Sequence, residues 1–202
     1  MKPRTLSIIA GISYLVIFFS AIFANFFVLE TIFDDPLVAI QEHHIMVRLG
    51  TVAFLITVVF DVVVAWALYE LYKANNLSGL STLFRMMHAA IMGVAIFALP
   101  LALISTTTKD VLRHVDIFNT IWLIGLFFFG IHLVLLGRIL QRPAIISAFL
   151  IIAGIMYMTD TIAHFLLPQY ENYASVFLAL VAIPSIFGEM ALSVWLLAKG
   201  GK

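Results

Sequence analysis

The feature that most constrains this chain is a set of six apolar runs, each long enough to cross a membrane as a helix. About 20 helical residues span the hydrocarbon core of a bilayer. Short connections, which hold most of the Pro, Asn and charged residues, separate the runs. The pattern predicts an all-α polytopic membrane protein, with a bundle of about six transmembrane helices in a single domain over residues 1–202. The expected helices cover residues 6–28, 46–71, 81–105, 117–139, 143–167 and 173–198.

The composition agrees with lipid as the surrounding solvent. Of the 202 residues, 63% are hydrophobic and 11% are charged, and the mean hydropathy is +1.12. A soluble domain carries about 25% charged residues and could not hide so much apolar surface from water. The net charge is +0 and no basic patch is present, which argues against a nucleic-acid partner. Cysteine is absent, which excludes thiolate-bound zinc, all-cysteine iron–sulfur clusters and cysteine-linked haem.

Basic residues near the helix ends predict the orientation. Lys and Arg gather in the loops on the cytoplasmic side of a membrane protein. Lys109 and Arg113 fall on one side of the predicted bundle, and seven basic residues fall on the other. We therefore expect both termini in the cytoplasm. The first run exceeds a signal-peptide core of about 7–15 residues, so we expect it to be retained as a helix. The seven basic residues are Lys2, Arg4, Lys73, Arg138, Arg142, Lys199 and Lys202.

Several stretches together resemble a known family. The most specific are GLFFFGIHLVLLG at residues 125–137 and GEMALSVWLLAKG at residues 188–200. In order and spacing they resemble the bacterial membrane family named domain of unknown function 4386, over nearly the whole chain. The resemblance implies a multi-pass protein of the bacterial inner membrane, and it implies no established activity, ligand or catalytic residue. Supporting stretches are GISY (11–14), FR (84–85), GIMYMTD (154–160) and LPQY (167–170).

Ionisable residues inside the apolar runs are the candidates for function. Each costs about 2.5–3.5 kcal/mol at a helix centre on insertion scales, so each should face the bundle and find a partner. A rise of about 1.5 Å per residue places most of one group about 10–16 Å from the cytoplasmic helix ends. We expect this inner set to converge, with Arg85 bonded to at least one carboxylate. Its members are Asp61, Arg85, His88, His132 and Glu189.

Helix packing and a second polar set follow from the same pattern. Small polar residues at helical spacing predict that the Ser185–Glu189–Ser193 face of the last helix points into the bundle. The outer half of the predicted bundle holds a less specific polar set. Its members are Glu30, Arg48, Asp160 and His164.

Three interpretations of the inner set stay open. It can be a structural network in which Arg85 neutralises a carboxylate. It can be a metal or haem site, for which His88 and His132 are the candidate ligands, although no compact metal-binding motif is present. It can be a proton or ion path, because carboxylates and imidazoles exchange protons within the membrane.

These interpretations lead to different functions. Our working hypothesis is a small transporter or permeation-type protein whose interior site handles a proton, an ion or a small molecule. The first alternative is a metal- or haem-binding membrane enzyme, and the second is a membrane-embedded regulator or structural protein. The sequence selects no cofactor, substrate or oligomeric state, and the lipid bilayer is the one partner that it predicts directly.

Overall fold

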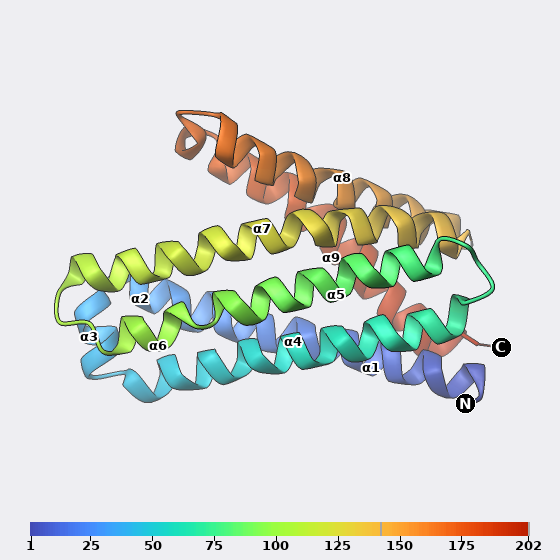
Figure 1. Ribbon diagram of the computed structural model, residues 1–202, viewed down its shortest axis with the longest axis horizontal. Helices are drawn as coiled ribbons and strands as arrows, with labels where there is room; N and C mark the ends of the chain where they lie inside the picture. Colours follow the sequence, from blue (N-terminus) through green and yellow to red (C-terminus); the bar gives the residue numbers. More distant parts are fainter. Residues whose placement is uncertain (142, 202) are drawn as a thin grey trace.

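The computed structural model describes residues 1–141 and 143–201, and these fold into an all-α bundle without strands (Figure 1). Six helices are long and apolar enough to cross a membrane, which confirms the predicted polytopic architecture. The six spans are Pro3–Asp34, His44–Tyr72, Ser78–Leu103, Thr108–Leu140, Ala144–Leu166 and Ala174–Ala198.

Two of the spans change geometry along their length. The first consists of α1 (Pro3–Ile22), the π-helical segment η1 (Phe23–Leu29) and α2 (Glu30–Asp34). The third consists of α5 (Ser78–Ala95) and α6 (Ala98–Leu103), separated just before Pro100. The other spans are α4 (His44–Tyr72), α7 (Thr108–Leu140), α8 (Ala144–Leu166) and α9 (Ala174–Ala198). Two short elements, α3 (Pro36–Gln41) and the 3-10 turn η2 (Tyr170–Asn172), lie in connections.

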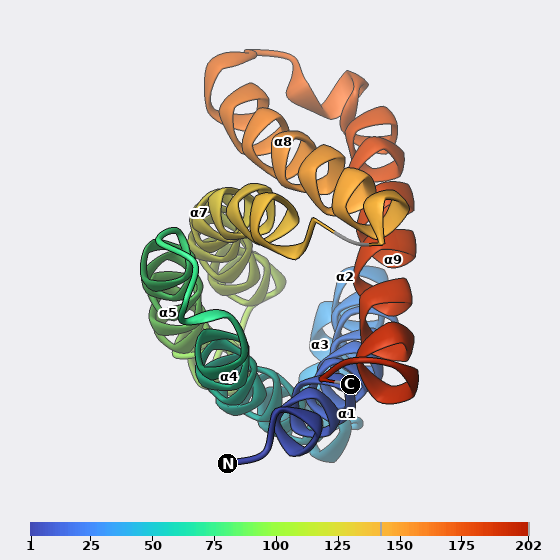
Figure 2. The same cartoon turned by 90° about the vertical axis from the view of Figure 1, so that its right-hand side faces the viewer.

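The spans form a ring. Each one packs against the next along the chain, and α9 returns to α1 to close the circle (Figure 2). Both termini lie at one end of the bundle, which we call the terminal end (Figure 1). The alternation of the helices places Lys109 and Arg113 at the opposite end. Of the seven basic residues counted for the terminal end, Lys2, Arg4, Lys73, Arg138 and Lys199 lie there, whereas Arg142 and Lys202 fall outside the described residues.

Two spans extend beyond their predicted boundaries. The first continues to Asp34, and α7 begins at Thr108 although the apolar run begins at residue 117. Hydropathy marks the part of a helix that lies in lipid, whereas capping decides where the helix starts. The hydroxyl of Thr107 accepts a hydrogen bond from the Asp110 N–H at 3.2 Å, which caps α7 outside the apolar run. The carboxylate of Asp35 caps α3 in the same way, through the Val38 N–H at 3.3 Å.

Arg4 fastens the first span to the last. Its guanidinium donates to the carbonyl oxygens of Leu196 at 2.9 Å and Gly200 at 3.0 Å, and also to that of Leu197. These carbonyls belong to the last turn of α9 and to the residues just after it, where backbone acceptors lack helical partners and a cation is favoured. Further in, the Ser193 hydroxyl donates to the Gly11 carbonyl at 2.9 Å. The α1–α9 contact therefore closes the ring through polar bonds as well as packing.

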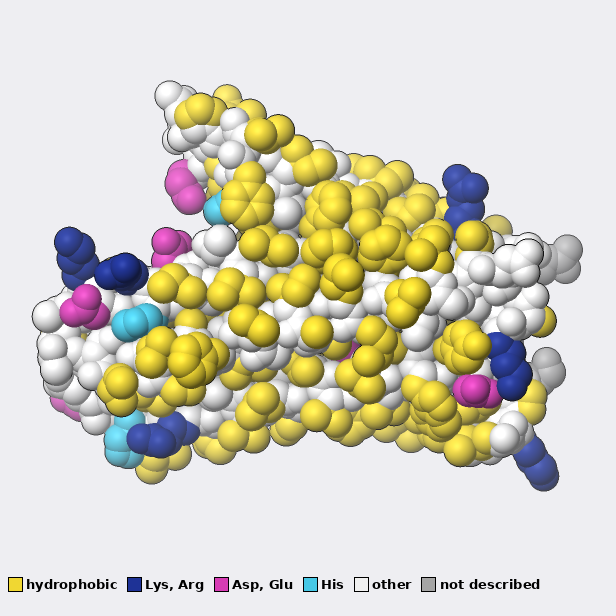
Figure 3. Space-filling model, in the orientation of Figure 1, with side chains coloured by type: hydrophobic (Ala, Val, Ile, Leu, Met, Phe, Trp, Pro, Cys, Tyr) yellow, Lys and Arg dark blue, Asp and Glu magenta, His cyan; other side chains and the backbone are white. Residues whose placement is uncertain are grey.

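The outer surface of the ring is apolar and its interior has two apolar clusters. Large exposed side chains such as Phe19, Leu83 and Val194 face outward, where lipid would solvate them. On the face in Figure 3, hydrophobic side chains cover the middle of the bundle, and Lys and Arg side chains lie towards its two ends. One interior cluster, around Phe54 and Phe118, lies in the half away from the termini, and the other, around Leu136, lies towards the terminal end. Buried polar groups lie between these clusters.

Helices α7 and α8 approach so closely that glycine is required at their crossing. A Cβ atom on Gly130 would lie 2.6 Å from the Gly154 carbonyl oxygen and 2.9 Å from the side chain of Met158. Membrane helices depend on small residues for this kind of packing, because lipid offers little hydrophobic force to hold them together. The contact fixes the position of α7, which carries two residues of the site described below.

We expect Gly130→Ala to lower the thermal stability of the protein, because the added methyl group must push α7 away from the Gly154 backbone. Overpacking of this kind costs about 1–3 kcal/mol. The midpoint of thermal unfolding in detergent micelles measures the effect. Gly93→Ala is the matched control, since a Cβ there meets nothing within 4 Å. A Gly130→Ala protein as stable as the Gly93→Ala protein would contradict the packing.

Candidate functional site

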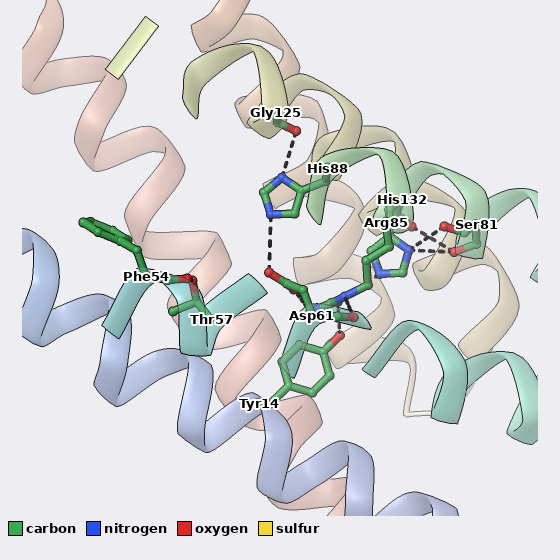
Figure 4. A network of polar contacts seen from close by, with 9 residues as sticks. All are labelled: Tyr14, Phe54, Thr57, Asp61, Ser81, Arg85, His88, Gly125 and His132. Atoms are coloured by element: carbon green, nitrogen blue, oxygen red, sulfur yellow. Dashed lines mark hydrogen bonds and ion pairs between the residues drawn. The ribbon is translucent and has the colours of Figure 1, made fainter. Parts of the chain in front are cut away.

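The guanidinium of Arg85 is the centre of the buried polar network. Arg85 lies on α5 and is 1% exposed. One of its terminal nitrogens donates to the Asp61 carboxylate on α4 at 2.5 Å, and its Nε donates to the Asp61 backbone carbonyl at 3.3 Å (Figure 4). A buried pair is tolerated when each charge meets an opposite charge and hydrogen bonds. The half of the bundle towards the terminal end therefore contains a compensated ion pair.

Two further helices supply partners for the same guanidinium. It donates to the Tyr14 hydroxyl on α1 at 2.9 Å and to Nε2 of His132 on α7 at 3.2 Å (Figure 4). Its face also lies over the Tyr14 ring, 4.9 Å from the centroid, and over the Phe129 ring at 5.2 Å. Such contacts stabilise a desolvated cation through the quadrupole of the ring. Arg85 thus joins α1, α4, α5 and α7 at one point.

His132 is held as a neutral imidazole. Arginine has no acceptor, so the Nε2 that meets Arg85 must be the acceptor. The proton of the ring is therefore on Nδ1, which lies 3.0 Å from the Ser81 carbonyl and 2.9 Å from the Ser81 hydroxyl. Both ring nitrogens are occupied, and a proton on Nε2 would oppose the guanidinium. We conclude that His132 positions Arg85.

His88 has the opposite arrangement. Its Nδ1 lies 2.9 Å from the Gly125 carbonyl, which can only accept, so Nδ1 carries a hydrogen. Its Nε2 then faces Oδ2 of Asp61 across 3.6 Å, a separation longer than a hydrogen bond but within ion-pair range (Figure 4). Gly125 makes room for the ring, because a Cβ there would lie 3.4 Å from Nδ1 and 3.0 Å from the sulfur of Met92. A proton on Nε2 would lie between the imidazole and the carboxylate.

Glu189, the fifth predicted member of the inner set, stands slightly apart. It is half-buried, and no ion pair joins it to any residue that the structure describes. The Ser185–Glu189–Ser193 face does turn inward, since Ser185 and Ser193 are both buried. The structure therefore brings four of the five residues into contact and joins Glu189 to none of them by a hydrogen bond or ion pair within the described residues.

The predicted outer set divides into two parts. Asp160 and His164, on α8, meet at Tyr170, whose hydroxyl donates to the Asp160 carboxylate at 2.6 Å and whose ring lies 4.7 Å from that of His164. Partial burial, and next this bond, raise the pKa of the Tyr170 hydroxyl above its ordinary value. Glu30 and Arg48 are exposed and make no ion pair within the described part of the chain. The outer residues thus tie η2 to α8 and do not converge as four.

The positions of the His, Asp and Glu side chains test the interpretation of the inner set as a metal site. No group of three or more His, Asp or Glu side chains in residues 1–141 and 143–201 is placed to hold a metal ion. His88 and His132 are the candidate ligands, and both ring nitrogens of His132 and the Nδ1 of His88 already have hydrogen-bond partners. A cation at His132 would have to displace the guanidinium from Nε2. The residues present do not fit a metal or haem in this arrangement.

The sequence analysis did not single out Tyr14 as a site residue. Tyr14 is 1% exposed and its hydroxyl lies in the buried network. The sequence does contain a weak indication that Tyr14 is buried. Ala10 and Gly11, small residues about one turn away, allow a neighbouring helix to approach. Gly125 gave no signal as a hydrogen-bond acceptor, because its side chain takes no part.

Comparison with known proteins shows the family to which the chain belongs. The family model described as Domain of unknown function (DUF4386) matches residues 9–200. The chain belongs to this family. An uncharacterized protein of the archaeon Archaeoglobus fulgidus is 31% identical to this DUF4386 chain over 157 residues, which cover 75% of the chain and 83% of the relative. The predicted resemblance to this family is confirmed, and the chain is also similar to a protein of an archaeon. No solved structure matches the chain.

We expect Arg85→Leu to destabilise this DUF4386 protein more than His88→Gln or His132→Gln does. Removing Arg85 leaves Asp61 buried without its cation, and breaking a buried pair costs about 3–5 kcal/mol. The double variant Asp61→Leu/Arg85→Leu should recover much of this loss, because no uncompensated charge is left. Thermal unfolding in micelles measures all four proteins, with Arg48→Leu as the exposed control. If Arg85→Leu is no less stable than Arg48→Leu, the network does not depend on the pair.

Proposed function

We propose that this protein is a small proton-linked membrane transporter in which Asp61, Arg85 and His88 form an interior proton site. The observation that carries the proposal is the direct opposition of His88 Nε2 and Asp61 Oδ2 at 3.6 Å. Because the Gly125 carbonyl fixes a hydrogen on Nδ1, the edge of the ring that faces Asp61 is free to gain or lose a second proton. Imidazole exchanges protons near neutral pH more readily than any other side chain.

The ion pair supports reversible uptake at this position. Arg85 cannot release its proton, so it holds a permanent positive charge beside Asp61. That charge balances the ionised carboxylate when His88 is neutral, and the carboxylate in turn favours the imidazolium when His88 gains a proton. His132 and Tyr14 hold Arg85 in place throughout. In this proposal His88 exchanges the proton, and His132 and Tyr14 keep the Asp61–Arg85 pair in position.

The position of the site between apolar clusters supports coupling to a larger movement. Asp61, Arg85 and His88 are each buried, and apolar residues cover them towards both ends of the bundle. Water reaches such a site when the helices around it move, which is how a transporter exposes a midplane site to each side in turn. Interruptions at the α5–α6 junction and at Pro184 of α9 provide places where a span can bend.

For the orientation, we expect the terminal end to face the cytoplasm. The basic residues that the structure describes at this end favour that orientation under the positive-inside rule. Alkaline phosphatase, which is active outside the cytoplasm, should be inactive when fused after residue 202 and active when inserted after residue 106. The reverse pair of activities would show that the orientation is inverted.

For the proton site, we expect purified protein in lipid vesicles to carry protons down a pH gradient, measured with a pH-sensitive dye in the lumen. His88→Gln should slow the flux by about 100-fold, since a positioned proton-transfer group commonly contributes that much. His114→Gln is the matched control, because His114 bonds to Ser105 at 3.2 Å, away from Arg85. Wild-type vesicles no leakier than empty ones, or equal flux in the two variants, would refute the proposal.

A further inference from the structure

We infer that Glu189 is a second proton position of the same site and that the Tyr14 hydroxyl connects it to Asp61 and His88. This inference rests on the proposed function, because it assigns the group that exchanges the proton with the Asp61–His88 position. Glu189 is the member of the inner set that forms no ion pair with any described residue. Its placement, the free hydrogen of Tyr14 and the charge balance of the interior each support the assignment.

The packing of α9 against α1 places Glu189 level with Tyr14. The two helices run in opposite directions, and the Ser193 hydroxyl bonds to the Gly11 carbonyl at 2.9 Å. Glu189 lies about one turn from Ser193, and Tyr14 lies about one turn from Gly11, both in the direction away from the termini. The two side chains therefore lie at the same depth, and Tyr14 meets Arg85 at 2.9 Å.

The hydroxyl of Tyr14 has an unused donor. Its oxygen accepts from Arg85, so its own hydrogen is available to a second group. None of the hydrogen bonds among the described residues uses this hydrogen, and Tyr14 is buried. Buried hydroxyls generally find an acceptor. No hydrogen bond of the structure joins this hydroxyl to the carboxylate of Asp61 or of Glu189, so transfer through Tyr14 requires a side-chain movement that brings each carboxylate to it in turn.

The charges of the site balance with one shared proton. Arg85 and ionised Asp61 cancel, so an ionised Glu189 alone would leave one uncompensated negative charge in an apolar interior, which is costly. A proton on Glu189 removes this charge. A proton on His88 compensates it equally well, because imidazolium and ionised Glu189 then cancel. The site is neutral in both states, so the proton can move between them without a change in net charge.

Transfer between these states breaks and forms bonds in equal number. The O–H bond of protonated Glu189 breaks as the Tyr14 oxygen takes that hydrogen, and the original Tyr14 hydrogen passes to Asp61 and then to Nε2 of His88. No oxidant or reductant takes part. The titratable and charged groups around Glu189 are Tyr14 and Tyr157, on the helices α1 and α8 that pack against α9, and Asp61 and Arg85 on α4 and α5.

Infrared difference spectroscopy of the full chain in lipid nanodiscs tests the assignment without any transport assay. A protonated carboxyl group gives a C=O band that an ionised one lacks. We expect this band in the wild-type protein, its loss in Glu189→Gln and its retention in Glu70→Gln, which removes a half-buried carboxylate paired with Lys73. In His88→Gln the band should persist to more alkaline pH, because the alternative position for the proton is gone.

Two further variants keep the test decisive. Glu189→Asp retains a carboxyl group and should restore a band if Glu189→Gln loses it through misfolding. Tyr14→Phe should leave the band in place and slow proton flux about tenfold or more, since it removes the connecting hydroxyl. A band that survives Glu189→Gln and disappears in Asp61→Asn would overturn the inference.

The vesicle assay separates this inference from the proposed function. Proton flux in the wild type, together with a band that does not depend on Glu189, refutes the second proton position and leaves the transporter proposal standing. A Glu189-dependent band that His88→Gln extends to alkaline pH, in a protein that moves no protons, supports the shared proton and refutes the transporter proposal.

Discussion

The constraint on which this structure depends is the cost of a charge in an apolar medium. Arg85 is fully buried in a bundle whose outer surface faces lipid, and its charge is compensated by a carboxylate, a hydroxyl, an imidazole and two aromatic faces. These partners come from three other helices. The interactions that compensate the guanidinium are therefore also the interactions that fix how α1, α4 and α7 surround α5.

The backbone must allow those partners to come close, and small residues make this possible. Gly130 and Gly154 bring α7 against α8, and the Gly11–Ser193 bond brings α1 against α9. Arg4 then closes the ring at the terminal end by capping α9. In lipid such contacts carry much of the specificity that apolar burial supplies in water. The close approach of α1 and α9 also places Glu189 at the same depth as Tyr14. The packing of the helices therefore determines which side chains lie near the Arg85 network.

The sequence predicted the parts of this arrangement that depend on one helix at a time. Hydropathy located six spans, and the cost of charge in lipid singled out Asp61, Arg85, His88 and His132 for the interior. It did not reveal Tyr14, because a tyrosine at an interface and one in the core look alike until the neighbouring helix is known. It grouped Glu30 and Arg48 with Asp160 by depth alone, although depth does not specify the rotation of a helix. The partner of Asp160, Tyr170, lies in a connection that hydropathy does not resolve.

In the proposed proton site, the two buried histidines have different surroundings. Both rings have one nitrogen near a backbone carbonyl, which fixes a hydrogen there. The second nitrogen of His132 faces a permanent donor, so a proton there would be repelled. The second nitrogen of His88 faces a carboxylate, so a proton there is attracted. Identical side chains on adjacent helices therefore take different roles, because one faces the cation and the other faces the anion of the same ion pair.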